Sequence, residues 1–307
     1  MKRALRRSVP VASAVLGAAC AATDARIPIV PSPAPYDLQA ERVELASDSV
    51  DVVRGWFARG RPGGGVVVLL HGIGASRWTM LDRARFLHAE GFGVVLVDFR
   101  GHGESTPASS TYGVRESADA AAAVALARAR EPGERVGVIG VSMGGAATLL
   151  GPRPLPIDAL VLESVYPTID RAVADRARAW LGPLGAPLVP LFLDVILPSR
   201  GVHREALRPI DRIAEQRAPI LILAGTADRY TTIREARALY ARAPEPKAFW
   251  AVDGAGHEDL HAFARTEYER RVGGFLSAEL RTLPPGAVTV ARGSAALDLA
   301  ALDSLMR

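Results

Sequence analysis

Short apolar runs rich in valine, isoleucine and leucine alternate along this chain with longer amphipathic segments. The runs are residues 66–70, 93–99, 135–141, 157–163, 218–224 and 248–252. Dense branched residues over so few positions favour strands that are buried on both faces, as in a parallel sheet. The segments between them that favour helices are 77–90, 114–130, 143–151, 231–242 and 258–280. The alternation predicts an α/β fold in which helices cover a mostly parallel sheet.

Two further features complete this predicted domain, which we place at residues 38–281. "RVELA" at 42–46 and "VVRGWFA" at 52–58 have the pattern of an edge hairpin. The interval at about 165–215 is too long for a single crossover, and its prolines divide an apolar sequence into short helical pieces. We therefore expect a small helical cap over the carboxyl edge of the sheet.

The N-terminal segment 1–20 has the layout of an export signal. A basic head precedes a run of small apolar residues, which is too short to span a bilayer and is followed by Cys20. This lone cysteine resembles the lipid-attachment site of bacterial lipoproteins, although Leu16 stands one place too early for that pattern. We expect export to the periplasm or anchoring in the cell envelope. Simple cleavage near Ala19 or Ala21 and a cytoplasmic protein with an N-terminal tail are the alternatives.

A proline-rich stretch at 21–37 predicts an extended linker, which could hold the domain away from a membrane surface. The C-terminal tail at 282–307 has a turn at "PPGA" and a weak amphipathic pattern, from which no role follows. Cys20 is the only cysteine, so an intrachain disulfide is excluded.

The charge of the chain gives no support to a nucleic-acid partner. The formal net charge is +4, and four unopposed basic residues lie within the basic head, which leaves the rest of the chain neutral. The arginines are scattered among acidic residues instead of forming a basic stripe. We therefore expect a small-molecule or lipid-like substrate and no nucleic acid.

The stretch "GVSMG" places Ser142 between Gly140 and Gly144. The pattern G-x-S-x-G is weak evidence alone, because glycine is common in this chain, but its context is specific. A predicted strand precedes the serine and a good helix former follows it. Such a strand-to-helix turn holds the serine in a strained conformation and exposes its hydroxyl beyond the sheet, where small neighbours are needed.

A serine hydroxyl needs a base, and the base needs a group that orients it. Asp228 in "LAGTADRY" and His257 in "VDGAGHEDL" each follow a predicted strand. Since the carboxyl ends of parallel strands meet at one edge of a sheet, Ser142, Asp228 and His257 are predicted to converge as a catalytic triad. Taken singly, Asp228 could instead cap the next helix, and His257 could be an ordinary loop residue.

From about residue 40 to 281 the chain resembles the α/β-hydrolase superfamily, and within it the small esterases, lysophospholipases and serine-aminopeptidase-like enzymes. The resemblance rests on "GVSMG", on "LLHGIGAS" at 69–76 and on "VDFRGHGES" at 97–105. It implies an eight-stranded, mostly parallel sheet. It also implies an oxyanion hole made by the backbone N–H groups of Ile73 and Met143. His71 and His102 would hold loops near the site, and no cofactor would be needed.

"HEDLH" also matches the zinc-binding pattern H-E-x-x-H through His257, Glu258 and His261. A zinc protease carries this pattern inside a helix, whereas here it follows a strand and a glycine-containing loop. We therefore expect no metal and interpret His261 as a solvent-facing helix residue.

Other acidic residues lie near the same edge. Glu163 ends a predicted strand and is a reserve for orienting the histidine. Asp98 is expected to shape the turn on the oxyanion side, and Asp253 to cap the loop before His257.

These residues predict a serine hydrolase of carboxylic esters or thioesters that works through an acyl-enzyme. Acyl transfer or peptide cleavage would use the same triad, so the sequence leaves both open, together with a non-catalytic envelope protein that keeps the fold. Apolar residues of the cap favour a greasy acyl group, or else they only pack the cap onto the body. They are Trp180, Leu184, Leu188, Val189, Leu191, Phe192 and Leu193.

Overall fold

The computed structural model describes residues 35–48 and 51–282. The predictions made for segment 1–20 with Cys20, for most of the linker and for the tail beyond residue 282 lie outside these residues. Within them, no helix is long and apolar enough to cross a membrane.

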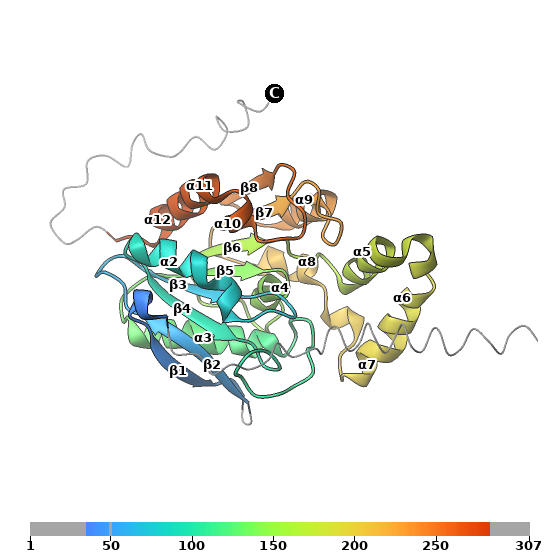
Figure 1. The fold of residues 1–307 in the computed structure, drawn as a ribbon, viewed down its shortest axis with the longest axis horizontal. Coiled ribbons are helices and arrows are strands. Elements are labelled where there is room, and N and C mark those ends of the chain that lie inside the picture. Colours follow the sequence, from blue (N-terminus) through green and yellow to red (C-terminus); the bar gives the residue numbers. More distant parts are fainter. Residues whose placement is uncertain (1–34, 49–50, 283–307) are drawn as a thin grey trace, which may run out of the picture.

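An eight-stranded sheet crosses the centre of the molecule in the order β1-β2-β4-β3-β5-β6-β7-β8 (Figure 1). The β1–β2 and β2–β4 pairs are antiparallel and all other pairs are parallel. The strands are β1 (Glu41–Ala46), β2 (Val52–Ala58), β3 (Val66–Leu70), β4 (Gly93–Asp98), β5 (Val136–Val141), β6 (Ala159–Glu163), β7 (Ile220–Gly225) and β8 (Lys247–Val252). The predicted fold class and edge hairpin are confirmed.

Helices lie on both faces of this sheet, as Figure 1 shows. They are α2 (Leu81–Ala89), α3 (Glu116–Arg130), α4 (Met143–Leu149), α9 (Ile233–Arg242), α10 (Leu260–Phe263), α11 (Arg265–Tyr268) and α12 (Gly274–Leu280). The predicted helix at 77–90 begins with a 3-10 turn at Arg77–Met80, and the one at 258–280 is interrupted at Ala264 and contains a π-helical turn at Glu269–Gly273.

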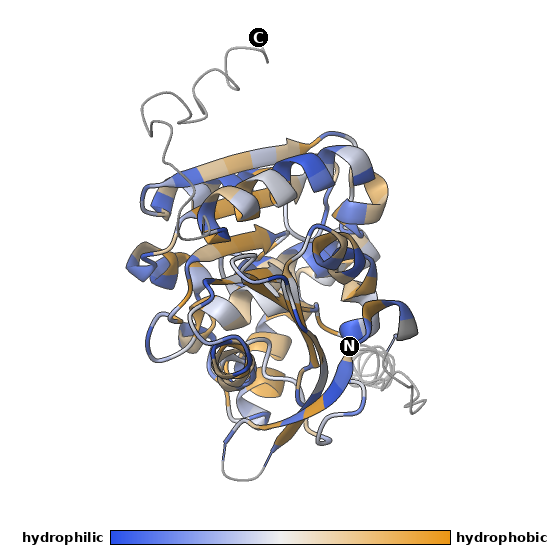
Figure 2. Ribbon diagram, turned by 90° about the vertical axis from the view of Figure 1, so that its left-hand side faces the viewer, coloured by the Kyte–Doolittle hydropathy of each residue, from blue (hydrophilic) through white to orange (hydrophobic). Residues whose placement is uncertain are grey.

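The buried strands contribute alternate residues to two apolar cores. In β3, the side chains of Val66, Val68 and Leu70 join the core under α3 and α4, whereas Val67 and Leu69 join the core under α2 and α12. Each such valine or leucine contributes roughly 1.5–3 kcal/mol when fully buried. In Figure 2 the strands are accordingly apolar, and polar residues lie on the outer faces of the helices. Burial on both faces fixes the register of these strands, and with it the place where each one ends.

The chain between β6 and β7 forms several short helices that extend away from the sheet (Figure 1). The longest, α5 (Ile169–Leu181), begins at Thr168, whose side chain accepts a hydrogen bond from the Arg171 N–H. After it come 3-10 turns at Gly182–Gly185, Arg204–Ala206 and Ile213–Glu215, a π-helical turn at Phe192–Ile196, and α6 (Leu188–Leu191), α7 (Leu197–Ser199) and α8 (Pro209–Arg212). Prolines stand at the first turn of several of these pieces, where a missing N–H costs least.

Candidate active site

Ser142 stands between the end of β5 and the first residue of α4 in a conformation that few non-glycine residues adopt. Its backbone angles are φ 50° and ψ −113°. A residue held there stores about 1–3 kcal/mol of strain, which the surrounding structure must offset. The turn reverses the chain at the carboxyl edge of the sheet, as the sequence predicted, and the Ser142 side chain lines a cavity there.

The glycines around Ser142 are required by close backbone contacts. A Cβ on Gly140 would lie 2.6 Å from the Cα of Gly145, and a Cβ on Gly144 would lie 2.4 Å from the Leu70 carbonyl oxygen. Real Cβ atoms do not approach other atoms so closely. Strand β5, helix α4 and the end of β3 therefore pack tightly only because these positions lack side chains.

Asp228 follows β7, and its carboxylate accepts hydrogen bonds from the chain just after it and from His257. Its Oδ1 accepts from the backbone N–H groups of Tyr230 (2.8 Å) and Thr231 (2.9 Å), and its Oδ2 accepts from Nδ1–H of His257 at 2.8 Å. The alternative that Asp228 caps the next helix is wrong, because α9 is capped by Thr232 with Glu235 in a reciprocal capping box.

His257 follows β8 and is oriented by this bond. Because Nδ1 donates to Asp228, the neutral ring carries a free lone pair on Nε2. The His257 side chain is 18% exposed while that of Asp228 is fully buried, so the imidazole faces the cavity and the carboxylate lies behind it. Tyr230 packs edge-on against the imidazole, with 5.5 Å between ring centroids.

Ser142 and His257 line the same cavity of about 770 Å³. Gly72 and Ile73 line it as well, and a Cβ on Gly72 would lie 3.5 Å from the Ser142 Cβ. Met143 is the first residue of α4, where a helix N–H has no intrahelical acceptor. Ile73 thus lines the cavity with Ser142, and Met143 directly follows Ser142 in the chain; these are the two positions predicted for the oxyanion hole.

The loop that carries Ile73 is held by the two histidines for which a structural role was predicted. His71 donates from Nδ1 to the Gly72 carbonyl (2.7 Å) and accepts at Nε2 from the Phe99 N–H (3.0 Å). His102 accepts at Nε2 from the Gly74 N–H at 3.1 Å. Burial, with a smaller contribution from the neighbouring His102, lowers the pKa of His71 to about 3, so its imidazole is neutral at pH 7.

Asp98 ties the same loop to the turn after β4, as expected. It accepts hydrogen bonds from the Arg77 N–H and guanidinium, both at 2.7 Å, and from the Glu104 N–H at 2.9 Å. The pair of Arg77 and Asp98 is almost completely buried. Burial raises the pKa of Asp98, and the guanidinium and the N–H donors act against that rise. Asp253, in the loop between β8 and His257, accepts a hydrogen bond from the hydroxyl of Thr226, which follows β7.

Two sequence-based interpretations of nearby residues are wrong. His261 is not solvent-facing: it is 0% exposed, stacks on Phe86 and bonds Glu269 through Nε2 at 3.0 Å. Glu163 is not a reserve partner for His257, because it is buried against the Arg83 guanidinium and the Tyr268 hydroxyl. Helix α10 is too short for its sequence pattern to have indicated that His261 is buried.

The "HEDLH" motif does not gather ligands. His257 bonds Asp228 and His261 bonds Glu269, so the two histidines face different partners. Over residues 35–48 and 51–282, no group of three or more histidine, cysteine or acidic side chains is placed to hold a metal ion.

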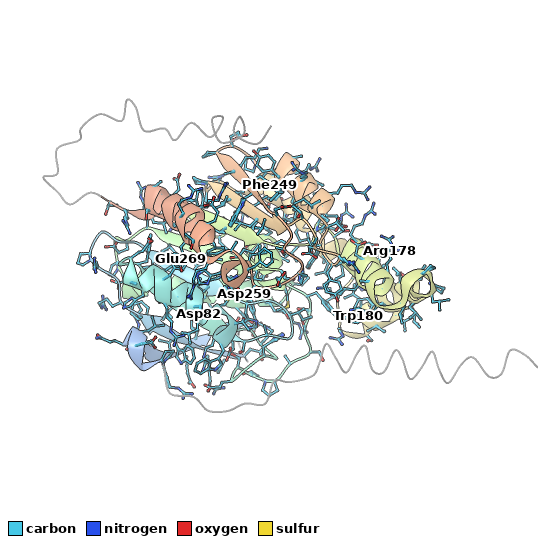
Figure 3. The ribbon with its side chains drawn as sticks, turned by 45° about the horizontal axis from the view of Figure 1, so that its top comes forward. Asp82, Arg178, Trp180, Phe249, Asp259 and Glu269 are labelled. Atoms are coloured by element: carbon cyan, nitrogen blue, oxygen red, sulfur yellow. The ribbon has the colours of Figure 1, made fainter. Side chains whose placement is uncertain are left out.

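The cavity is lined by several residues that the sequence did not single out. Ser164 follows β6, Arg176 lies on α5, and Tyr230 follows Asp228. Of the apolar cap residues named above, Trp180 lines the cavity, whereas Val189, Phe192 and Leu193 pack against the core of the body. Figure 3 shows Trp180 on α5, and Asp82 and Asp259 on the body at the other side of the cavity. Arg176 is one of several arginines on the amphipathic helix α5, so the sequence alone does not assign it to a site.

Known proteins resemble this chain in sequence and in structure. An uncharacterized protein of Mycobacterium tuberculosis is 31% identical over 207 residues, which are 67% of this chain and 68% of the relative. The uncharacterized protein YqkD of Bacillus subtilis is 25% identical over 218 residues, 68% of this chain and 70% of that protein. The Pyrococcus furiosus esterase Pf2001 superposes with a TM-score of 0.67 and 26% identity, covering 82% of this chain and 96% of its own.

The sequence model of one family matches most of the region that contains the sheet and the site. The matched residues are 67–271, and the model describes the alpha/beta hydrolase family. They include the loop after β3, the Ser142 turn, Asp228 and His257, which the structure brings to one edge of the sheet. The chain belongs to the alpha/beta hydrolase family.

Proposed function

We propose that this protein is a serine hydrolase that cleaves carboxylic esters or thioesters. The observation that carries the proposal is the hydrogen bond from His257 to the buried Asp228 carboxylate, in the same cavity that Ser142 lines. The structural similarity to the Pyrococcus furiosus esterase supports an ester as the substrate.

In the proposed reaction the Ser142 hydroxyl attacks the carbonyl carbon of the ester. Nε2 of His257 takes the hydroxyl proton as the carbon–oxygen bond forms and gives it to the departing alcohol or thiol as the ester bond breaks. Water then attacks the acyl-enzyme and gives a proton to Nε2. The proton returns to Ser142 as the acid is released, so the enzyme ends unchanged.

The remaining groups stabilise charge at fixed positions. Asp228 holds the imidazole in the tautomer that accepts at Nε2 and stabilises the imidazolium while it exists. The N–H groups of Ile73 and Met143 are proposed to donate to the oxyanion of the tetrahedral intermediates. Loss of one such donor typically raises the barrier by about 3 kcal/mol. These steps use only groups of this chain and water.

The test has two parts on separate samples: covalent labelling of Ser142 with a fluorophosphonate, and hydrolysis of 4-nitrophenyl butyrate by the unlabelled protein. Ser142→Ala should lose the label and about 10⁴–10⁶ of kcat, because the bond-forming atom is gone. Ser199→Ala removes an exposed hydroxyl on α7 and serves as the matched control, with full labelling expected. An unlabelled wild-type protein would point to a non-catalytic member of the fold, and labelling with ester formation from an added alcohol would point to acyl transfer.

We also propose that the protein is exported and held in the cell envelope, with a lipid-like acyl substrate. The support is the N-terminal sequence, with its basic head, its short apolar run and Cys20. The mass of the mature N-terminus measures this directly. A diacylglycerol-modified Cys20 is expected, cleavage at a neighbouring alanine would restrict the proposal to export, and an intact Met1 would overturn it.

A further inference from the structure

Arg176 on α5 is a half-buried cation whose side chain lines the cavity together with Ser142 and His257. Its only hydrogen bond among the described residues is a long one, 3.5 Å, to the Ala172 carbonyl one turn earlier in its own helix. Its guanidinium carbon lies 5.3 Å from the centroid of the Tyr230 ring. No carboxylate of residues 35–48 or 51–282 lies within ion-pair distance of it. The charge of Arg176 is therefore available to a ligand.

The other cationic residues of the cavity wall are already paired. Arg83 bonds Glu163 and Asp259, and Arg85 bonds Asp37 and Asp82. Their positive charges are neutralised by neighbouring carboxylates, on the body side of the cavity. An anion that entered the cavity would consequently find its free counter-charge on α5.

The distance from Arg176 to the proposed reaction centre is short. Tyr230 packs against both groups: its ring centroid is 5.3 Å from the Arg176 guanidinium carbon and 5.5 Å from the centroid of the His257 imidazole. The guanidinium can therefore lie no further from the imidazole centroid than these two distances combined. An acidic group separated from an ester carbonyl by a few covalent bonds fits this span.

Burial also affects the cation itself. Desolvation lowers the pKa of Arg176, and the negative charge of the nearby Asp228 acts in the opposite direction. Arginine still remains protonated at neutral pH. A partly desolvated guanidinium binds a carboxylate or phosphate more strongly than an exposed one, and can do so with two parallel hydrogen bonds.

We propose that Arg176 recognises an anionic group, a carboxylate or a phosphate, on the substrate and so makes this hydrolase selective for acidic esters. The proposal rests on the function proposed above. It assigns Arg176 to substrate binding. The alternative role for Arg176 is indirect: its charge would only steady Asp228, and it would then affect every ester equally.

The experiment compares kcat/KM for matched anionic and neutral esters. One pair is 4-nitrophenyl hemisuccinate and 4-nitrophenyl methyl succinate, in which the terminal carboxylate is free in the first and is a neutral methyl ester in the second. The other is 1-butyrylglycerol 3-phosphate and 1-butyrylglycerol. We expect the wild-type protein to prefer the anionic member of at least one pair by about 10- to 100-fold, the range of a charge-assisted hydrogen bond. The pair that shows the preference identifies the anion as carboxylate or phosphate.

Arg176→Gln should reduce this preference to about threefold or less, and Arg176→Lys should retain part of it, because lysine keeps the charge but not the planar fork. Arg171→Gln removes an exposed arginine from the same helix and is the control, with the preference intact. If Arg176→Gln lowered kcat/KM equally for anionic and neutral esters, the role of Arg176 would be indirect and the proposal would be overturned. A wild-type protein with no preference for the anionic ester of either pair would also overturn it. In both cases fluorophosphonate labelling of Ser142 would still report on the hydrolase function separately.

Discussion

The two sides of the cavity differ in how firmly they are held. On the body side, the loop after β3 is fixed by His71 and His102 and by the buried pair of Arg77 and Asp98. On the other side, α5 and the turn after it expose apolar side chains, with Trp180 57% and Leu184 81% exposed. Within residues 35–48 and 51–282, the Trp180 side chain makes one hydrogen bond, from its Nε1 to the Tyr230 hydroxyl.

This difference separates two tasks of an enzyme. Groups that stabilise a transition state are effective only when they are fixed before the substrate arrives, because reorganisation during the reaction costs free energy. Groups that contact the variable part of a substrate can be less constrained. We therefore expect changes on the body side to affect kcat or the free energy of unfolding, and changes on α5 to affect selectivity and KM.

Among the changes that test this contrast between the two sides, the largest effect is expected for Asp228→Asn. The asparagine Oδ1 can still accept from the Tyr230 and Thr231 N–H groups, so the loop should keep its shape. Its NH₂ group would face His257 Nδ1 and favour the tautomer with the proton on Nε2, which cannot accept the Ser142 proton. We expect kcat for 4-nitrophenyl butyrate to fall about 10³–10⁴-fold.

The control for this variant is Asp253→Asn, which changes an exposed acid in the loop before His257. Its kcat should stay within about threefold of wild type, as for a surface change outside the machinery. If Asp228→Asn kept a third of the wild-type kcat, another group would have to orient His257. The hydrogen bond between His257 and Asp228 would then not be what preorganises the body side of the cavity.

The next effect concerns stability and pH. The pKa of His71 is lowered to about 3 in the folded protein from an ordinary value of 6.5, so below pH 6.5 the unfolded chain binds a proton that the folded protein does not. The contribution of the neutral, buried His71 to the free energy of unfolding is fully present above pH 6.5 and is lost progressively as the pH falls towards 3. The slope is about 1.4 kcal/mol per pH unit, so about 2 kcal/mol is lost between pH 7 and pH 5.

Urea denaturation at pH 7 and pH 5 measures this loss, with His71→Asn as the comparison. The variant is less stable at pH 7, because the bonds to Gly72 and Phe99 are altered, but its free energy of unfolding should depend less on pH by about 2 kcal/mol. Parallel pH dependence in the two proteins would contradict the buried, neutral state of this imidazole.

The sequence predicted the elements of the fold closely, for a physical reason. Strands buried on both faces are dense in branched apolar residues, so β3 was predicted with its observed bounds and β4 within one residue of them. The common placement of Ser142, Asp228 and His257 was predictable because the first two follow buried strands, the third follows the edge strand β8, and parallel strands end at a common edge. The positions of these three residues could be predicted from the glycine-containing turns and from their short distance in sequence after each strand.

Contacts between distant elements were not predictable in the same way. His261 is buried because Phe86 and Tyr268 from two other helices enclose it, and nothing in its own helix indicates those partners. Glu163 pairs with Arg83, eighty residues earlier in the chain. Arg176 was missed for the same reason: its unpaired charge is a property of the assembled cavity, and a single arginine in an arginine-rich sequence does not reveal it.

The smallest effect is expected for Trp180→Ala, on the loosely held side of the cavity. The indole lines the cavity and is more than half exposed, so its removal should leave the melting temperature within about 2 °C of wild type. A long acyl chain that packs on the indole would lose roughly 1 kcal/mol of contact, which raises KM about fivefold for 4-nitrophenyl octanoate but not for the acetate.

Leu184→Ala removes an even more exposed side chain that does not line the cavity, and should change neither KM. Trp180→Phe keeps an apolar ring but not the hydrogen bond to Tyr230, and should recover most of the octanoate KM if contact with the acyl chain is the cause. A fall in kcat for both esters, or a melting temperature lowered by more than 5 °C, would show that this residue belongs to the rigid part of the site and would remove the contrast between the two sides.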